Sequence, residues 1–111
     1  YLQEQLARWG LQVRLHRSPV DALHALRDPR CNARLLLTDL TMPGMTGLQL
    51  AREARELRPG MPVLMVTGNA NVIDPEVLRA HGVGELLRKP LDAIKLSAAL
   101  ERLLAPGQAR P

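Results

Sequence analysis

The 111-residue sequence is poor in aromatic side chains and in cysteine, and it contains no long run of apolar residues. Aromatic residues make up 2% of the chain, which leaves almost no platform for stacking nucleic-acid bases. The single cysteine, Cys31, cannot form an internal disulfide; we interpret it as structural or incidental, in keeping with a reducing compartment. Without an apolar span of about 18 residues or a signal-peptide pattern, the sequence predicts a soluble domain without membrane contact.

Basic residues outnumber acidic ones, and the formal net charge is +4 at pH 7. All but two of the 15 basic residues are arginine, the exceptions being Lys89 and Lys95. They are scattered through every segment instead of forming a run, which argues against nucleic-acid binding by this chain. A hydrophobic content of 46% is enough for the core of one domain.

Patterns typical of strands and helices alternate along the chain. Strands are predicted where apolar residues alternate with polar ones or form short uninterrupted runs, at 11–15, 34–38, 63–66 and 85–88. The first predicted helix covers 2–9, and the later helices begin at N-cap candidates, in chain order Ser18, Thr46, Asp74 and Asp92. This alternation predicts an α/β fold with a doubly wound parallel sheet.

In the predicted helix that follows Ser18, we expect the apolar residues Val20, Leu23 and Leu26 to face inward.

Three predicted strands end on polar side chains, namely Asp39 after the apolar run in "LLLTDLTMPGMTG", Thr67 and Lys89. The carboxyl ends of parallel strands meet at one edge of the sheet, where open α/β sheets bind their ligands. A carboxylate nucleophile, a hydroxyl donor and a fixed positive charge at one edge suit chemistry on an oxyanion. The sequence therefore predicts a site that combines these three side chains.

Three motifs in this order resemble the receiver domain of bacterial two-component signalling. They are Asp39 followed by Met42-Pro43 and Gly47, Thr67 at the end of an apolar strand, and Lys89-Pro90. The resemblance covers essentially the whole chain. It implies a flavodoxin-like receiver fold with strand order 2-1-3-4-5, and a cis peptide bond at Lys89-Pro90.

The resemblance also implies a role for each site residue. Asp39 would be the phosphoacceptor, attacking a phosphohistidine on a histidine kinase or histidine phosphotransfer protein, while Thr67 and Lys89 would hold the phosphoryl group. In the complete domain Mg²⁺ would be bound by Asp39 and by the backbone carbonyl of Thr41. The resemblance implies cytoplasmic localisation, and we expect no independent catalytic activity from this chain.

Two features depart from the family pattern. The family begins with a strand that ends in an acidic pair for the metal, whereas this sequence begins at what resembles the first helix, so we expect poor Mg²⁺ binding. Leu86 stands where the family often has a Tyr or Phe that reports the switch. The stretch "GELLRKPL", with Arg88, looks more like the receiver of a hybrid histidine kinase than like one fused to a DNA-binding output domain.

The absent strand would lie between residues 11–15 and 35–38, in the centre of the sheet. We therefore expect a receiver domain over 1–105 that lacks its first strand, followed by a flexible tail at 106–111. Either residues upstream supply the strand, or the fragment re-pairs its sheet or forms a strand-swapped oligomer.

Other interpretations are open. A small α/β enzyme would need a second acid, a base or a glycine-rich phosphate loop, and no such loop motif is present. A degenerate receiver could act as a phosphorylation-independent interaction module, and Asp39 could merely cap a loop. The remaining candidate ligands are expected to pack or to lie at the surface: Met42, Met45, Met61, Met65, His16, His24 and His81.

Overall fold

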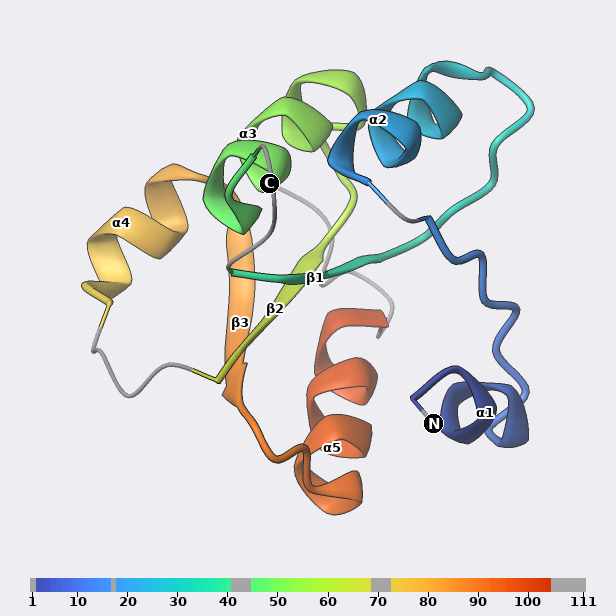
Figure 1. Cartoon of the computed structure of the whole chain (residues 1–111), viewed down its shortest axis with the longest axis vertical. Helices are drawn as coiled ribbons and strands as arrows, with labels where there is room; N and C mark the ends of the chain where they lie inside the picture. The colour runs from blue at the N-terminus through green and yellow to red at the C-terminus, as the bar shows by residue number, and fades with distance from the viewer. Residues whose placement is uncertain (1, 17, 41–44, 69–72, 105–111) are drawn as a thin grey trace.

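The computed structural model describes residues 2–16, 18–40, 45–68 and 73–104. Within these residues the elements are α1 (Leu2–Arg8), α2 (Pro19–Arg27), β1 (Leu36–Asp39), α3 (Gly47–Leu57), β2 (Val63–Thr67), α4 (Pro75–Ala80), β3 (Val83–Arg88) and α5 (Ala93–Leu104). The strands lie side by side in the middle of the molecule, with helices around them (Figure 1). None of the helices in these parts of the chain is long and apolar enough to cross a membrane.

The three strands of the described residues run parallel, in the order β1-β2-β3. Asp39 pairs with Val66, and Thr67 pairs with Arg88, so the carboxyl ends of the strands lie at one edge. A parallel sheet with crossover helices confirms the predicted fold class. The strands differ from the predicted bounds at their ends. Strand β1 begins at Leu36 instead of residue 34 and extends to Asp39, β2 extends to Thr67, and β3 begins two residues before Glu85.

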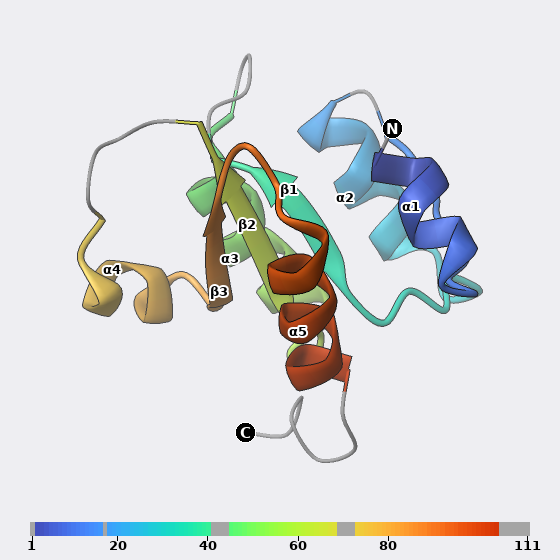
Figure 2. The ribbon, with the colours of Figure 1, turned by 90° about the horizontal axis from the view of Figure 1, so that it is seen from below.

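Both faces of the sheet are covered, which explains why the first four residues of β2 are an uninterrupted apolar run. Leu64 packs on one face in a cluster with residues of α5, while Val63 and Met65 pack on the other face with Ala51 of α3. All five residues of β2 are buried. Figure 2 shows α5 and α3 on opposite sides of β2, the arrangement expected of a parallel sheet between helix layers.

Side chains at the predicted N-caps start the helices. The carboxylate or hydroxyl oxygens of Ser18, Thr46, Asp74 and Asp92 accept hydrogen bonds from backbone N–H groups of the first turns of α2, α3, α4 and α5. Gly82, with φ of +81°, ends α4. The Lys89-Pro90 bond is cis, as predicted.

The predicted strand at Leu11–Leu15 is wrong, because this segment has no regular secondary structure. A strand needs a neighbour for its backbone hydrogen bonds, and among the described residues β1 pairs with β2 alone. Direct pairing of Leu11–Leu15 with β1 is not formed. Leu11 and Val13 still pack against the α5 cluster, but Leu15 is 74% exposed.

The expected inward orientation of Val20 is also wrong, since this side chain is 65% exposed. Leu23 and Leu26 are buried as predicted, together with Pro19 and Ala22. Because buried residues of a helix recur every three or four positions, Pro19, Leu23 and Leu26 share one face and Val20 falls beside it. The predicted tail at 106–111 lies outside the described residues.

Candidate functional site

Asp39 and Lys89 meet at the carboxyl edge of the sheet. Asp39 is the last residue of β1, Lys89 follows β3, and Lys89 Nζ lies 2.7 Å from Asp39 Oδ1. The side chains of Asp39 and Lys89 are 43% and 48% exposed, so the ion pair is open to an approaching reactant. This contact brings together two of the three side chains that the sequence predicts to share a site.

Thr67 ends β2, between the strands that carry Asp39 and Lys89. Thr67 is 4% exposed, and its backbone carbonyl accepts a hydrogen bond of 2.8 Å from the N–H of Lys89. This bond fixes the start of the turn after β3 against the end of β2. The three predicted site residues therefore share one edge of the sheet, while the role of the Thr67 hydroxyl stays a prediction.

The described residues do not by themselves fit a Mg²⁺ site. Mg²⁺ requires an octahedral set of oxygen ligands, and Asp39 supplies one carboxylate, of which one oxygen already contacts Lys89. In the described ranges no group of three or more His, Cys, Asp or Glu side chains could hold a metal. Thr41, the predicted carbonyl ligand, lies outside the described residues, as do Met42 and Pro43.

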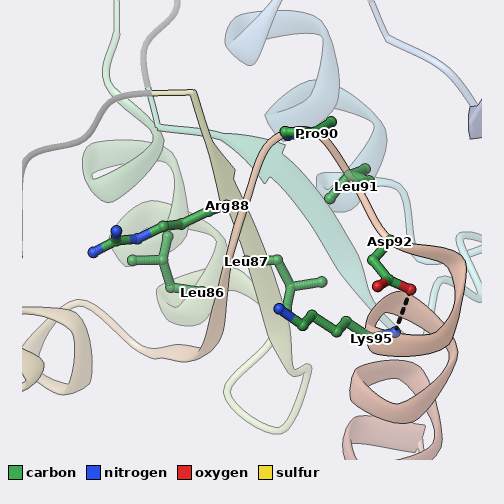
Figure 3. A pocket seen from close by; sticks show the side chains of 7 residues that line it. All are labelled: Leu86, Leu87, Arg88, Pro90, Leu91, Asp92 and Lys95. Atoms are coloured by element: carbon green, nitrogen blue, oxygen red, sulfur yellow. Dashed lines mark hydrogen bonds between the residues drawn. The ribbon is translucent and has the colours of Figure 1, made fainter.

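A pocket of about 280 Å³ lies between the end of β3 and the start of α5. Its lining contains none of Asp39, Thr67 and Lys89. Figure 3 shows Leu86 and Arg88 on one side of β3 and Leu87 on the other, with the Lys95 side chain near Leu87. Leu86 is half-buried and packs against the cluster shared by α3 and the sheet, so its position suits a packing role.

The other candidate ligands behave as packing or surface residues where the structure describes them. Met65 is fully buried in the core, and Met45 and Met61 pack against the cluster between α2 and α3. Cys31 is half-buried, carries a free thiol and packs against the same cluster. His81 bonds through Nδ1 to the carbonyl of Val77 at the end of α4.

Sequence comparison relates the chain to signalling proteins. The transcriptional regulatory protein ZraR of Escherichia coli strain K12 is 36% identical over 104 residues, covering 94% of this chain and 23% of that protein. The sensor histidine kinase RcsC of Salmonella typhi is 34% identical over 101 residues, covering 89% of this chain and 10% of the kinase. The chain thus spans less than a quarter of these relatives.

Solved structures share the fold. The receiver domain of a sensor histidine kinase from Pseudomonas aeruginosa PAO1, described with magnesium coordinated in its active site cleft, matches with a TM-score of 0.79 at 25% identity, covering 93% of this chain and 84% of that one. A response regulator from Burkholderia pseudomallei, described with a phosphorylated aspartic acid, calcium ion and citrate, matches with a TM-score of 0.77 at 26% identity, covering 89% and 57%.

Residues 1–101 match the family described as the response regulator receiver domain. The parallel sheet, the acid and lysine at its carboxyl edge and the similarity to proteins of two-component signalling agree with that match. The chain belongs to the response regulator receiver domain family.

Proposed function

We propose that this chain is the phosphoacceptor domain of a two-component signalling protein and that Asp39 is the residue phosphorylated. The half-exposed Asp39 carboxylate, 2.7 Å from Lys89 at the carboxyl edge of the sheet, carries this proposal. A phosphodonor can reach a carboxylate in this position, and the positive charge of Lys89 can stabilise the phosphorylated product. The phosphorylated aspartic acid of the similar Burkholderia structure supports the proposal by similarity.

The proposed reaction is transfer of a phosphoryl group from a phosphohistidine to Asp39. A carboxylate oxygen forms a new P–O bond, the P–N bond breaks, and the departing imidazole keeps the electron pair and takes up a proton. The added phosphoryl group brings a charge of roughly −1.5 to −2, by analogy with phosphoserine. Lys89 is the nearest described cation to balance it, and Thr67 would donate its hydroxyl to a phosphoryl oxygen.

We propose a histidine kinase or a histidine phosphotransfer protein as the partner, and the cytoplasm as the compartment of the reaction. The relatives include both a sensor kinase and transcriptional regulatory proteins, so the intact protein is either a hybrid kinase or a response regulator. The output would be a changed interaction surface, biased by small shifts of Thr67 and Lys89 toward the phosphoryl group.

We also propose that Mg²⁺ is a cofactor of the complete domain and that its acidic ligands lie outside these 111 residues. The described residues supply too few oxygen ligands for the metal. The magnesium coordinated in the Pseudomonas structure supports the proposal by similarity.

The test is labelling of the intact protein with radioactive acetyl phosphate, in the presence and absence of Mg²⁺. We expect label that depends on Mg²⁺, is released by hydroxylamine as an acyl phosphate, and is lost in Asp39→Asn. Asp21→Asn, which changes an exposed carboxylate on α2, should label as the wild type does. Label that persists in Asp39→Asn would refute the assignment of the phosphoacceptor.

The isolated 111-residue polypeptide should label weakly or not at all, because its described residues do not form a metal site. Equal labelling of this polypeptide and the intact protein would show that the metal ligands have been misplaced.

A second candidate function is a phosphorylation-independent interaction module. It is favoured by the lack, among the described residues, of a cluster able to hold a metal. It predicts that the intact protein takes up no label and that Asp39→Asn leaves partner binding unchanged. The labelling experiment separates the two functions.

A further inference from the structure

We infer that Gly47 is a positioning residue for the Asp39 carboxylate, because the absence of a side chain at residue 47 lets α3 begin directly against the backbone of Asp39. This inference rests on the proposed function of Asp39. It goes beyond that function because it assigns the orientation of the nucleophile to a residue that takes no part in the chemistry.

Two hydrogen bonds fix the return of the chain to the end of β1. Gly47, the first residue of α3, donates its N–H to the carbonyl of Leu40 at 2.8 Å. Leu40 in turn donates its N–H to the carbonyl of Val66 in β2 at 2.9 Å. The start of α3 is therefore tied through Leu40 to the sheet, immediately beside the site.

A Cβ atom at residue 47 has no room in this arrangement. It would lie 2.2 Å from the carbonyl oxygen of Asp39 and 3.0 Å from both the carbonyl carbon of Asp39 and the Cα of Leu40. All three atoms belong to the backbone, so no change of side-chain rotamer can relieve the contact. Either Asp39 or the start of α3 would have to move by about 1 Å to restore ordinary van der Waals separation.

The carbonyl group of Asp39 is held from a second direction. The hydroxyl of Thr38, a residue that is 6% exposed, donates a hydrogen bond of 3.0 Å to this carbonyl oxygen. A displacement caused by a side chain at residue 47 would disturb this bond. Because the carboxylate of Asp39 extends from the same residue, its 2.7 Å contact with Lys89 would change as well.

Gly84 offers a matched control at the opposite end of the sheet. It lies near the amino end of β3, and a Cβ there would come within 2.7 Å of Cδ2 of Leu103 and 3.4 Å of the carbonyl oxygen of Val63. The closest atom is the end of a flexible side chain. Gly84→Ala therefore adds the same methyl group and a comparable close contact without touching the backbone of Asp39.

The experiment compares Gly47→Ala and Gly84→Ala in the intact protein, at a temperature where thermal unfolding shows each variant to be folded. Since a misplacement of about 1 Å costs on the order of 100-fold in rate, we expect phosphorylation of Asp39 by acetyl phosphate to slow by about that factor in Gly47→Ala. Gly84→Ala should keep the wild-type rate. The carbon-13 NMR signal of the Asp39 carboxyl and the amide signal of Leu40 should shift in Gly47→Ala alone.

A folded Gly47→Ala that is phosphorylated at the wild-type rate, with both NMR signals unchanged, would overturn the inference. If Gly47→Ala does not fold, Thr38→Val decides, since it releases the same carbonyl from the other side. We expect Thr38→Val to shift both signals and to slow phosphorylation, and unchanged signals and rate would again overturn the inference. Failure of the wild type to label Asp39 would instead refute the proposed function, while the NMR comparison would still test the backbone contact.

Discussion

At the scale of single residues, exposure decides what each charge contributes. The Asp39–Lys89 pair is close but almost half exposed, and an ion pair of this kind contributes about 0–1 kcal/mol to stability. Its close approach therefore matters more for the charge at the site than for the fold. The pair formed by Asp28 and Arg30 is likewise at the surface, but three hydrogen bonds hold it.

We predict that part of the free energy of unfolding depends on the ionisation of Asp28 and is lost in acid. The side-chain hydrogen bonds from Arg30 are the main cause that lowers the pKa of Asp28 below 3.8; the backbone N–H of Arg30 and the charges of Arg14 and His24 act in the same direction. Because the folded pKa lies below the unfolded one, ionised Asp28 stabilises the fold above pH 3.8, and this stabilisation is lost as the pH falls further. In Arg30→Ala the loss should be smaller.

The measurement is thermal unfolding of the wild type and Arg30→Ala as a function of pH. The difference between their midpoints should shrink as the pH falls below 3.8. A difference that stays constant through this range would contradict the assignment.

The site residues show what a sequence reveals at this scale. The placement of Asp39, Thr67 and Lys89 at one edge could be predicted, because each lies at the carboxyl end of a parallel strand or directly after it. The contact between Gly47 and the Asp39 carbonyl could not be predicted from the sequence. A motif identifies the glycine, but it does not show which atoms occupy the space that a side chain would need.

At the scale of the elements, one arginine joins α2 to α3. Arg58 follows α3, and its guanidinium donates to three backbone carbonyls at and beyond the end of α2: Nε to Leu26 at 3.1 Å, Nη1 to Cys31 at 3.0 Å and Nη2 to Asp28 at 2.9 Å. The last carbonyls of a helix lack partners within it, and Arg58 supplies a donor to one of them, the carbonyl of Leu26. The fork geometry of arginine makes three such bonds from one side chain.

We predict that Arg58→Ala lowers the free energy of unfolding by about 1–3 kcal/mol, since it removes three hydrogen bonds from a partly buried place. Arg58→Lys should recover a minor part, because an ammonium group cannot reach three carbonyls in the same fork geometry. Urea unfolding measures both.

Arg52→Ala, at an exposed position of α3, is the control. Its free energy of unfolding should stay within about 0.5 kcal/mol of the wild-type value. Equal losses in Arg52→Ala and Arg58→Ala would contradict the bridging role.

Local patterns predicted most elements because their signals are local. The N-caps at Ser18, Thr46, Asp74 and Asp92 and the apolar run of β2 depend on residues close in sequence. The strand at 11–15 was predicted from its alternation, but a strand depends on a neighbour that the alternation does not reveal.

At the scale of the whole molecule, the sheet is well covered on its faces, and among the described residues β1 and β3 are its two edge strands. Among the described residues β1 has β2 on one side and no strand on the other. The N–H groups of Leu36 and Leu40 point to β2, where they bond to the carbonyls of Pro62 and Val66. By the alternation of a parallel ladder, the N–H of Leu37 points to the open side, so this edge can accept a further strand.

The last prediction concerns this open edge. We expect the 111-residue polypeptide to self-associate as its concentration rises, because an unpaired strand edge beside half-buried leucines is a template for another strand. Leu37→Lys should shift the population toward monomer, since a charged side chain on an edge strand opposes strand addition. Ile94→Lys is the control: it replaces an apolar side chain that is 80% exposed and belongs to α5 instead of an edge strand, so it should leave the association unchanged. Sedimentation velocity over a range of concentrations measures the association of all three polypeptides.

A wild-type polypeptide that stays monomeric throughout, or association lost equally in both variants, would show that β1 is not the interface. A longer chain whose added strand covers this edge should be monomeric, because the backbone groups of β1 would then be paired within the molecule.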